Sequence, residues 1–319
     1  MSSVESPNAA RDFGEPFNAT DADIILRSVE NVDFRAHRLV LRLASPVFAD
    51  MITLAAPSTT DDELKDGLPV VQMIETERAL HLLLCFCYPN TIPPVHVLDD
   101  FSLAVHVISK FELGHAKHLV TSLLRAHVQE APERVYALAW LLQSRELVLL
   151  SAKASLAMPV LRDRTPPREF EHITAYALQE LLSFHFRCMQ QVASLREGWK
   201  WVTPGSVPAQ CHKSTGSHDR SCRCDYRTVS LSNGSQVAIR SWCQAYVDAA
   251  CIAYQNEGAL TAITRLTTCS AALLSAHECS NCKTEASVAL DKFSLVLKTR
   301  VEDIVAEAAT KLQTPFQTT

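Results

Sequence analysis

The stretch DADIILRSVENVDFRAHRLVLRLASPVFADM, from Asp21 to Met51, decides the fold of the first part of this 319-residue chain. It opens with an apolar, β-branched run over 24–29. Val32, Phe34 and Ala36 then alternate with polar neighbours, as the residues of a half-buried strand do. Because the two segments are short and adjacent, they predict a β-hairpin.

Helical spacing follows the hairpin. Leu39 and Leu43 lie four residues apart, which predicts a short helix over 37–44. Ser45 offers an N-cap hydroxyl and Pro46 suits the first helical position, so a second helix is predicted to start at Pro46. Further along, the pattern predicts a strand over 68–74 and a helix from its N-cap at Thr76 to Pro89.

This order of elements resembles the start of a BTB/POZ domain. The resemblance is carried by Asp21-Ala22-Asp23, His37-Arg38, Ser45-Pro46-Val47-Phe48 and Tyr88, and FSLAVHVISKFELGHAKHLVTSLLRAHV resembles the two closing helices. It covers roughly residues 21–130. Glu30-Asn31 stands where the family often has glycine, and asparagine tolerates the left-handed backbone almost as well. Chains with a helical tail and a cysteine pair are similar to an expanded class of fungal BTB proteins.

The resemblance implies an α+β fold, in which a small, mostly antiparallel sheet packs on helices. It also implies protein–protein interaction, with dimerisation through the first helix and the adjoining N-terminal segment. In some relatives that segment supplies a swapped strand, but residues 1–20 are polar and predict a disordered tail without one. A smaller interface or a monomer is the alternative to a homodimer.

Composition limits the classes of function. The net charge of −5 argues against nucleic-acid binding, because such proteins carry a basic footprint. No apolar run reaches the roughly 20 residues that span a bilayer, and the first residues do not form a signal peptide. We therefore expect a cytoplasmic or nuclear protein, or one found in both places, without a membrane segment.

The rest of the chain predicts an all-α C-terminal region. Residues 131–165 form a helical extension and 166–319 a helical region, with helices near 132–157, 172–197, 237–256, 259–276 and 284–313. Only 200–236, rich in Pro, Gly, Ser, His and Cys, interrupts it as a long loop or small hairpin. Loops of that length usually need something that holds them.

Cysteines provide a candidate for that role. Cys279 and Cys282 form a CxxC knuckle, and the loop contains Cys211, His212, His218, Cys222 and Cys224. A tetrahedral structural zinc site needs two such pairs. The predicted set is Cys211 or Cys222, with Cys224, Cys279 and Cys282, and His212 as a substitute for one of them. Zinc would then fix the loop 200–236 to residues 279–282.

Two alternatives remain for these cysteines. They are reduced thiols that pack as small apolar side chains, or the CxxC is a redox pair, which would require a βαβ context that the sequence does not predict. His185 and Cys188, three apart on one predicted helix, are a weaker pair of metal ligands than a packed helix face.

No GxGxxG, GxxxxGK[ST], GxSxG or HExxH motif is present, so the sequence predicts neither an enzyme nor a small-molecule substrate. We expect a scaffold that self-associates through its BTB region. The alternatives are a substrate adaptor of a cullin-3 ubiquitin ligase, docking through the third and fifth BTB helices, and a transcriptional co-regulator. The loop over 55–67 shows no hydrophobic-x-Glu signal for the cullin.

Overall fold

The computed structural model describes residues 10–54, 63–89, 91–158, 165–213, 222 and 224–316. Its contacts divide the chain into an N-terminal unit, residues 1–128 with 137–147, and a C-terminal unit, residues 129–136 with 148–319. Helices α6 (Pro132–Leu141) and α7 (Arg145–Ser155) contribute residues to both units. The predicted extension over 131–165 is thus shared between them, and the division into domains stays a prediction.

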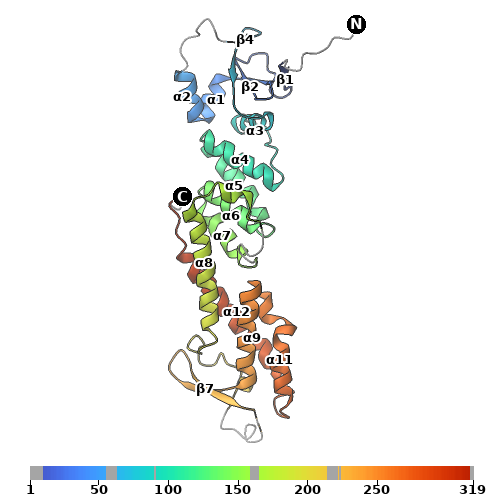
Figure 1. The fold of residues 1–319 in the computed structure, drawn as a ribbon, viewed down its shortest axis with the longest axis vertical. Coiled ribbons are helices and arrows are strands. Elements are labelled where there is room, and N and C mark those ends of the chain that lie inside the picture. The colour runs from blue at the N-terminus through green and yellow to red at the C-terminus, as the bar shows by residue number, and fades with distance from the viewer. Residues whose placement is uncertain are drawn as a thin grey trace, which may run out of the picture. The chain divides into compact units, whose positions relative to one another are not determined.

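A five-stranded sheet forms one side of the N-terminal unit (Figure 1). Its order is β1-β3-β2-β5-β4, and the sheet is mixed: β1 with β3 and β2 with β5 are parallel, whereas β2 with β3 and β4 with β5 are antiparallel. The expectation of a mostly antiparallel sheet is therefore wrong. The strands are β1 (Arg11–Asp12), β2 (Ile24–Arg27), β3 (Val32–Ala36), β4 (Leu64–Lys65) and β5 (Leu68–Gln72).

Strand β1 also corrects the expectation of a disordered tail over residues 1–20. Arg11 lies opposite Val32 in the parallel ladder, and Phe17 is 2% exposed and packs near the ring of Phe34. The segment is mostly polar, and only two aromatic residues, Phe13 and Phe17, anchor it beside Phe34. Its composition therefore did not reveal the strand. Residues 1–9 lie outside the described part of the chain.

The predicted hairpin and helices of this unit are confirmed. Asn31 adopts a left-handed φ of 60° in the turn between β2 and β3. The Ser45 hydroxyl accepts the Phe48 N–H at 3.2 Å and so caps the second helix, and Thr76 caps α3 through the Ala79 N–H. The helices are α1 (Arg38–Ala44), α2 (Pro46–Leu54), α3 (Glu77–Cys87), α4 (Leu98–Lys110) and α5 (Gly114–Leu124), followed by the 3-10 turn η1 (Arg125–His127).

The C-terminal unit is mostly helical, but it is not all-α. Strands β6 (His212–Lys213), β7 (Tyr226–Ser230) and β8 (Gln236–Arg240) form a small antiparallel sheet in the order β6-β8-β7. Strand β8 occupies the start of the helix predicted over 237–256. The helices are α8 (Ala175–Ser194), α9 (Ser241–Glu257), α10 (Thr261–Thr264), α11 (Leu266–His277) and α12 (Ala286–Thr310), with 3-10 turns η2 (Arg168–Glu171) and η3 (Ala209–Cys211).

An aromatic core holds the C-terminal unit together. The Trp199 ring stacks on Phe293 of α12, with 5.3 Å between centroids, and both side chains are buried. Helix α9 packs along α11, and α8 contacts both α9 and α12 (Figure 1). None of the described helices is long and apolar enough to cross a membrane.

Candidate functional site

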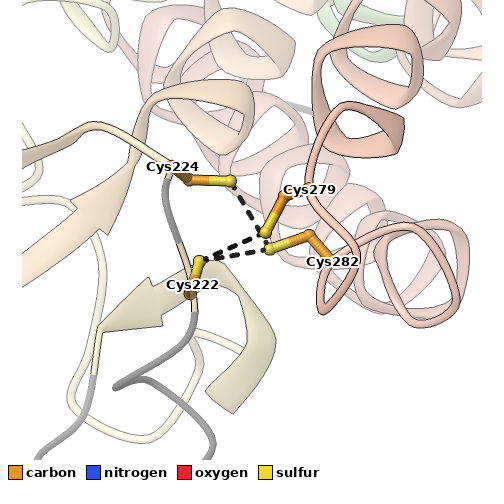
Figure 2. Close-up of side chains that lie close together, drawn as sticks. All are labelled: Cys222, Cys224, Cys279 and Cys282. Carbon is orange, nitrogen blue, oxygen red and sulfur yellow. Dashed lines mark hydrogen bonds between the residues drawn. The ribbon is translucent and has the colours of Figure 1, made fainter.

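Four of the predicted cysteines converge in the C-terminal unit. The sulfur atoms of Cys222, Cys224, Cys279 and Cys282 all lie within 4.8 Å of one another. Figure 2 shows the four side chains pointing toward a common centre. The sulfur–sulfur distances include 3.6 Å for Cys224 to Cys282, 3.6 Å for Cys279 to Cys222 and 3.7 Å for Cys222 to Cys282.

Two distant segments supply these ligands. Cys222 and Cys224 lie just before β7, whose pairing with β8 fixes the chain that follows them. Cys279 and Cys282 lie in the turn between α11 and α12, where the Cys279 carbonyl accepts the N–H groups of Cys282 and Lys283, both at 3.1 Å. That turn brings both thiols of the CxxC segment to one side.

The separations fit one tetrahedral metal ion. Zinc–sulfur bonds of ~2.3 Å in a tetrahedron place sulfur atoms about 3.8 Å apart, close to the three distances given above. A disulfide bond would require a sulfur–sulfur distance of ~2.05 Å, so the four cysteines of the cluster are not bonded to one another. All eleven cysteines of the chain are free thiols in this structure. A set of four cysteine sulfurs is the donor chemistry of structural zinc sites. The residues present therefore fit a zinc ion.

Burial sets the electrostatics of the cluster. Among the protein groups alone, burial raises the pKa of Cys282 to about 11, and it also raises the pKa of Cys224. Both thiols are then protonated at neutral pH, and a metal ion must displace these protons to bind the thiolates. Arg240, 3% exposed, donates a hydrogen bond from Nη1 to the Cys222 sulfur.

The structure separates the other predicted ligands from the cluster. Cys211 is fully buried and lies beside Cys243, which is also fully buried, so Cys222 rather than Cys211 completes the group of four. His212 belongs to β6, opposite Ile239. His218 lies outside the described residues. Within the described part of the chain, no other group of three or more His, Cys, Asp or Glu side chains has metal-binding geometry.

The imidazole of His185 lies beside a serine hydroxyl rather than beside a second metal ligand. Its Nε2 lies 2.8 Å from the Ser155 hydroxyl, and both side chains are buried. Cys188, also buried on α8, belongs to the helix face that packs inward. The interpretation as a packed helix is confirmed.

Sequence reasoning missed Arg240. The residue ends β8 and its partner Cys222 lies 18 positions earlier, in a segment without regular spacing. No periodicity connects the two positions, so only the folded β7–β8 ladder brings them together.

A second candidate surface lies on the N-terminal unit. Leu39 and Leu43 on α1 are 66% and 80% exposed, and Leu54 on α2 is 81% exposed. Because residues four apart share a helix face, the two α1 leucines form one apolar strip. Helices α1 and α2 pack against each other.

A pocket of about 380 Å³ lies on another part of this unit, between the end of α3 and the start of α5. Cys85, Cys87, Tyr88, His115 and Leu119 are among the residues that line it. Leu119 and Leu123, four residues apart on α5, are 44% and 40% exposed.

His37 and Tyr88 lie at the corner between β3 and α1. The Tyr88 hydroxyl accepts the His37 backbone N–H at 2.8 Å and lies 2.9 Å from its Nδ1, while Nε2 lies 3.3 Å from an Asp21 oxygen. Through these contacts His37 orders the corner between the hairpin and the first helix.

Comparison with known proteins agrees with the fold. The pattern that describes the BTB/POZ domain family matches residues 13–128, whereas the sequence predicted boundaries of 21 and 130. The earlier start includes the segment that continues from β1. A search of curated proteins found no match to the chain. With its mixed sheet, its capped helices and this match, the segment from residue 13 to residue 128 is a BTB/POZ domain.

Proposed function

We propose that this chain is a scaffold that pairs with a second copy of itself through the α1 surface of its BTB/POZ domain. The observation that carries this proposal is the exposure of Leu39 and Leu43 on one face of α1. Single exposed leucines are ordinary, but an apolar strip on an interaction module marks an interface. A two-fold dimer uses the same patch on both copies, so each strip would cover the other.

Sedimentation of the full chain tests this pairing. At micromolar concentration the wild type should sediment as a dimer of the 35.3 kDa chain, and the double variant Leu39→Glu/Leu43→Glu as a monomer. The matched control is Leu266→Glu/Leu274→Glu, which adds the same two charges at leucines that are 75% and 71% exposed on α11. A wild type that sediments only as a monomer would contradict the proposal.

A structural zinc ion in the C-terminal unit is the second part of the proposal. The sulfur separations of the four cysteines support it, and the ion would connect the segment before β7 to the turn between α11 and α12. Zinc has no redox chemistry of its own, so its role here is to hold two segments together. The scaffold would then present a C-terminal unit of fixed shape.

Elemental analysis of protein purified without added metal tests the zinc ion and its ligands. We expect about one zinc per chain, which Cys222→Ser should abolish. Cys211→Ser is the matched control, because Cys211 is buried outside the cluster, and this variant should retain zinc. Zinc retained by Cys222→Ser and lost from Cys211→Ser would instead assign the fourth ligand to Cys211.

The pocket between α3 and α5 favours a second candidate, the adaptor of a cullin-3 ubiquitin ligase. The family resemblance implies that the cullin docks on these two helices, and Leu119 and Leu123 offer it an apolar contact. Helix α3 is almost completely buried up to Cys87, so its contribution would come from the chain that follows it, where the half-buried Tyr88 lines the pocket.

Affinity purification from native cells with quantitative mass spectrometry distinguishes the candidates. If the adaptor function is correct, cullin-3 should be recovered with the wild type and lost with Leu119→Glu/Leu123→Glu. The α1 double variant serves as the reciprocal control, because it should lose the second copy of the chain. Recovery of the chain itself without any cullin would reject the adaptor function and support the scaffold function.

A further inference from the structure

Arg240 is a buried cation whose position is fixed by the backbone. It is 3% exposed, and it lies opposite Tyr226 in the β7–β8 ladder. The next residue, Ser241, donates its N–H to the Asp225 carbonyl at 2.9 Å. The Arg240 side chain therefore starts from a fixed place beside the segment that carries Cys222 and Cys224.

The charge of the proposed zinc centre gives this cation a role. Four thiolates around Zn²⁺ carry a net charge of −2, and burying that charge requires nearby compensation. A hydrogen bond from a charged donor to a charged acceptor is roughly twice as strong as a neutral one. Outer groups that hydrogen-bond to metal ligands also fix the ligand orientation.

We propose that Arg240 is a positioning residue of the zinc centre, which holds the Cys222 thiolate in place by donating Nη1–H to its sulfur. This inference rests on the zinc ion proposed above. The hydrogen bond withdraws electron density from one of the four sulfurs, so Cys222 is protected from electrophiles as well as oriented toward the metal. Arginine suits this task because its planar guanidinium presents N–H donors in a fixed direction, whereas a lysine ammonium is a mobile point charge.

Three variants of the full chain test the role of Arg240. Arg240→Met removes the donor and the charge, and Arg240→Lys keeps the charge without the planar donor. Arg265→Met is the matched control, because the Arg265 guanidinium pairs with Glu257 at 2.7 Å, on an exposed surface of the same unit. Zinc affinity is measured by competition with a chelator, and the absorption of the cobalt-substituted protein reports the ligand field.

Thiol alkylation gives a readout that a purely structural role would not produce. A thiolate sulfur displaces iodide from iodoacetamide, and peptide mass spectrometry reports the rate at each cysteine. We expect Arg240→Met to weaken zinc binding by roughly 10- to 100-fold. Alkylation should accelerate at Cys222 before it does so at Cys224, Cys279 and Cys282. The Arg265→Met protein should match the wild type in both measurements.

Each outcome decides the assignment. Wild-type zinc affinity and a wild-type alkylation rate at Cys222 in folded Arg240→Met would overturn it, and so would equal acceleration at all four cysteines. If Arg240→Met does not fold, Arg240→Lys decides, because wild-type behaviour there would exclude a role for the guanidinium N–H. A wild-type chain that binds neither zinc nor cobalt would overturn the zinc proposal together with this one.

Discussion

His185 is a histidine that the fold keeps neutral. Its imidazole lies beside the Ser155 hydroxyl inside the C-terminal unit, and burial lowers its pKa to about 4 from an ordinary value near 6.5. Because the folded pKa is lower than the unfolded one, protonation favours the unfolded chain. Stability is therefore complete above about pH 6.5 and is lost as the pH falls toward 4.

We predict that His185 alone removes about 2 kcal/mol of stability from the C-terminal unit between pH 7 and pH 5. His185→Gln keeps a hydrogen-bonding side chain that does not titrate in this range, so its loss over the same interval should be smaller by that amount. Urea unfolding at the two pH values measures the difference. Equal losses in both proteins would show that His185 carries no such penalty.

The cysteines of the cluster mark the limit of sequence reasoning at the residue scale. The spacing of Cys279 and Cys282 predicted two ligands without the fold, because a CxxC knuckle is a local turn. The choice between Cys211 and Cys222 depends on where the chain runs after Trp201, and that path is set by tertiary packing. Local patterns therefore found the candidates, and only the structure separated them.

At the scale of elements, the short strand β4 is held to the sheet by charge. Asp33 of β3, with a fully buried side chain, receives two hydrogen bonds from Arg27 of β2, at 2.5 and 3.0 Å. Lys65 of β4 reaches the same carboxylate at 2.8 Å and Asp12 of β1 at 2.7 Å. Burial opposes ionisation of Asp33, but the hydrogen bonds from Arg27 and Lys65 outweigh it, and the pKa of Asp33 lies below its ordinary value.

Asp33→Asn should destabilise the BTB/POZ domain by about 3 kcal/mol, because Arg27 and Lys65 would lose their buried counter-charge and keep only the more exposed carboxylates of Glu63 and Asp12. The control is Glu77→Gln, which breaks the more exposed ion pair between Glu77 and Arg11 and should cost about 1 kcal/mol or less. Urea unfolding of both variants provides the comparison. Similar small losses in the two proteins would mean that the buried network contributes little.

The small sheet of the C-terminal unit shows which elements a sequence reveals. The helices were found because their apolar spacing extends over many residues. A small hairpin was one of the two expectations for 200–236, and Asn233-Gly234 is a strong turn signal, with a φ of 82° at Gly234. The second strand of that hairpin, β8, was not predicted. Val237 and Ile239 alternate with polar or small neighbours for only a few positions before α9 begins, so the strand was read as part of the helix.

At the scale of the whole molecule, the two units should respond differently to the loss of zinc. All four cysteines of the cluster belong to the C-terminal unit, whereas the BTB/POZ domain belongs to the other. We predict that a strong chelator lowers the melting temperature of one calorimetric transition and leaves the other unchanged. Zinc-finger peptides suggest a binding free energy on the order of 10 kcal/mol, enough to decide whether the C-terminal unit folds.

Two cysteine variants make that measurement specific. Cys279→Ser should lower the same transition as the chelator and make it insensitive to further chelation. Cys269→Ser alters a buried cysteine of α11 outside the cluster, and its transition should still respond to the chelator. A chelator that shifts neither transition in the wild type would contradict a stabilising metal.

Distance along the chain between the two cysteine pairs also affects synthesis. Cys222 and Cys279 are 57 positions apart, so a ribosome that adds roughly 5–20 residues per second makes the first ligand roughly 3 to 11 seconds before the third. During that interval Cys222 and Cys224 have been translated while their partners have not. The nascent C-terminal unit thus passes through a stage in which two thiols have no complete metal site, and a chain cut short before Cys282 would remain at that stage.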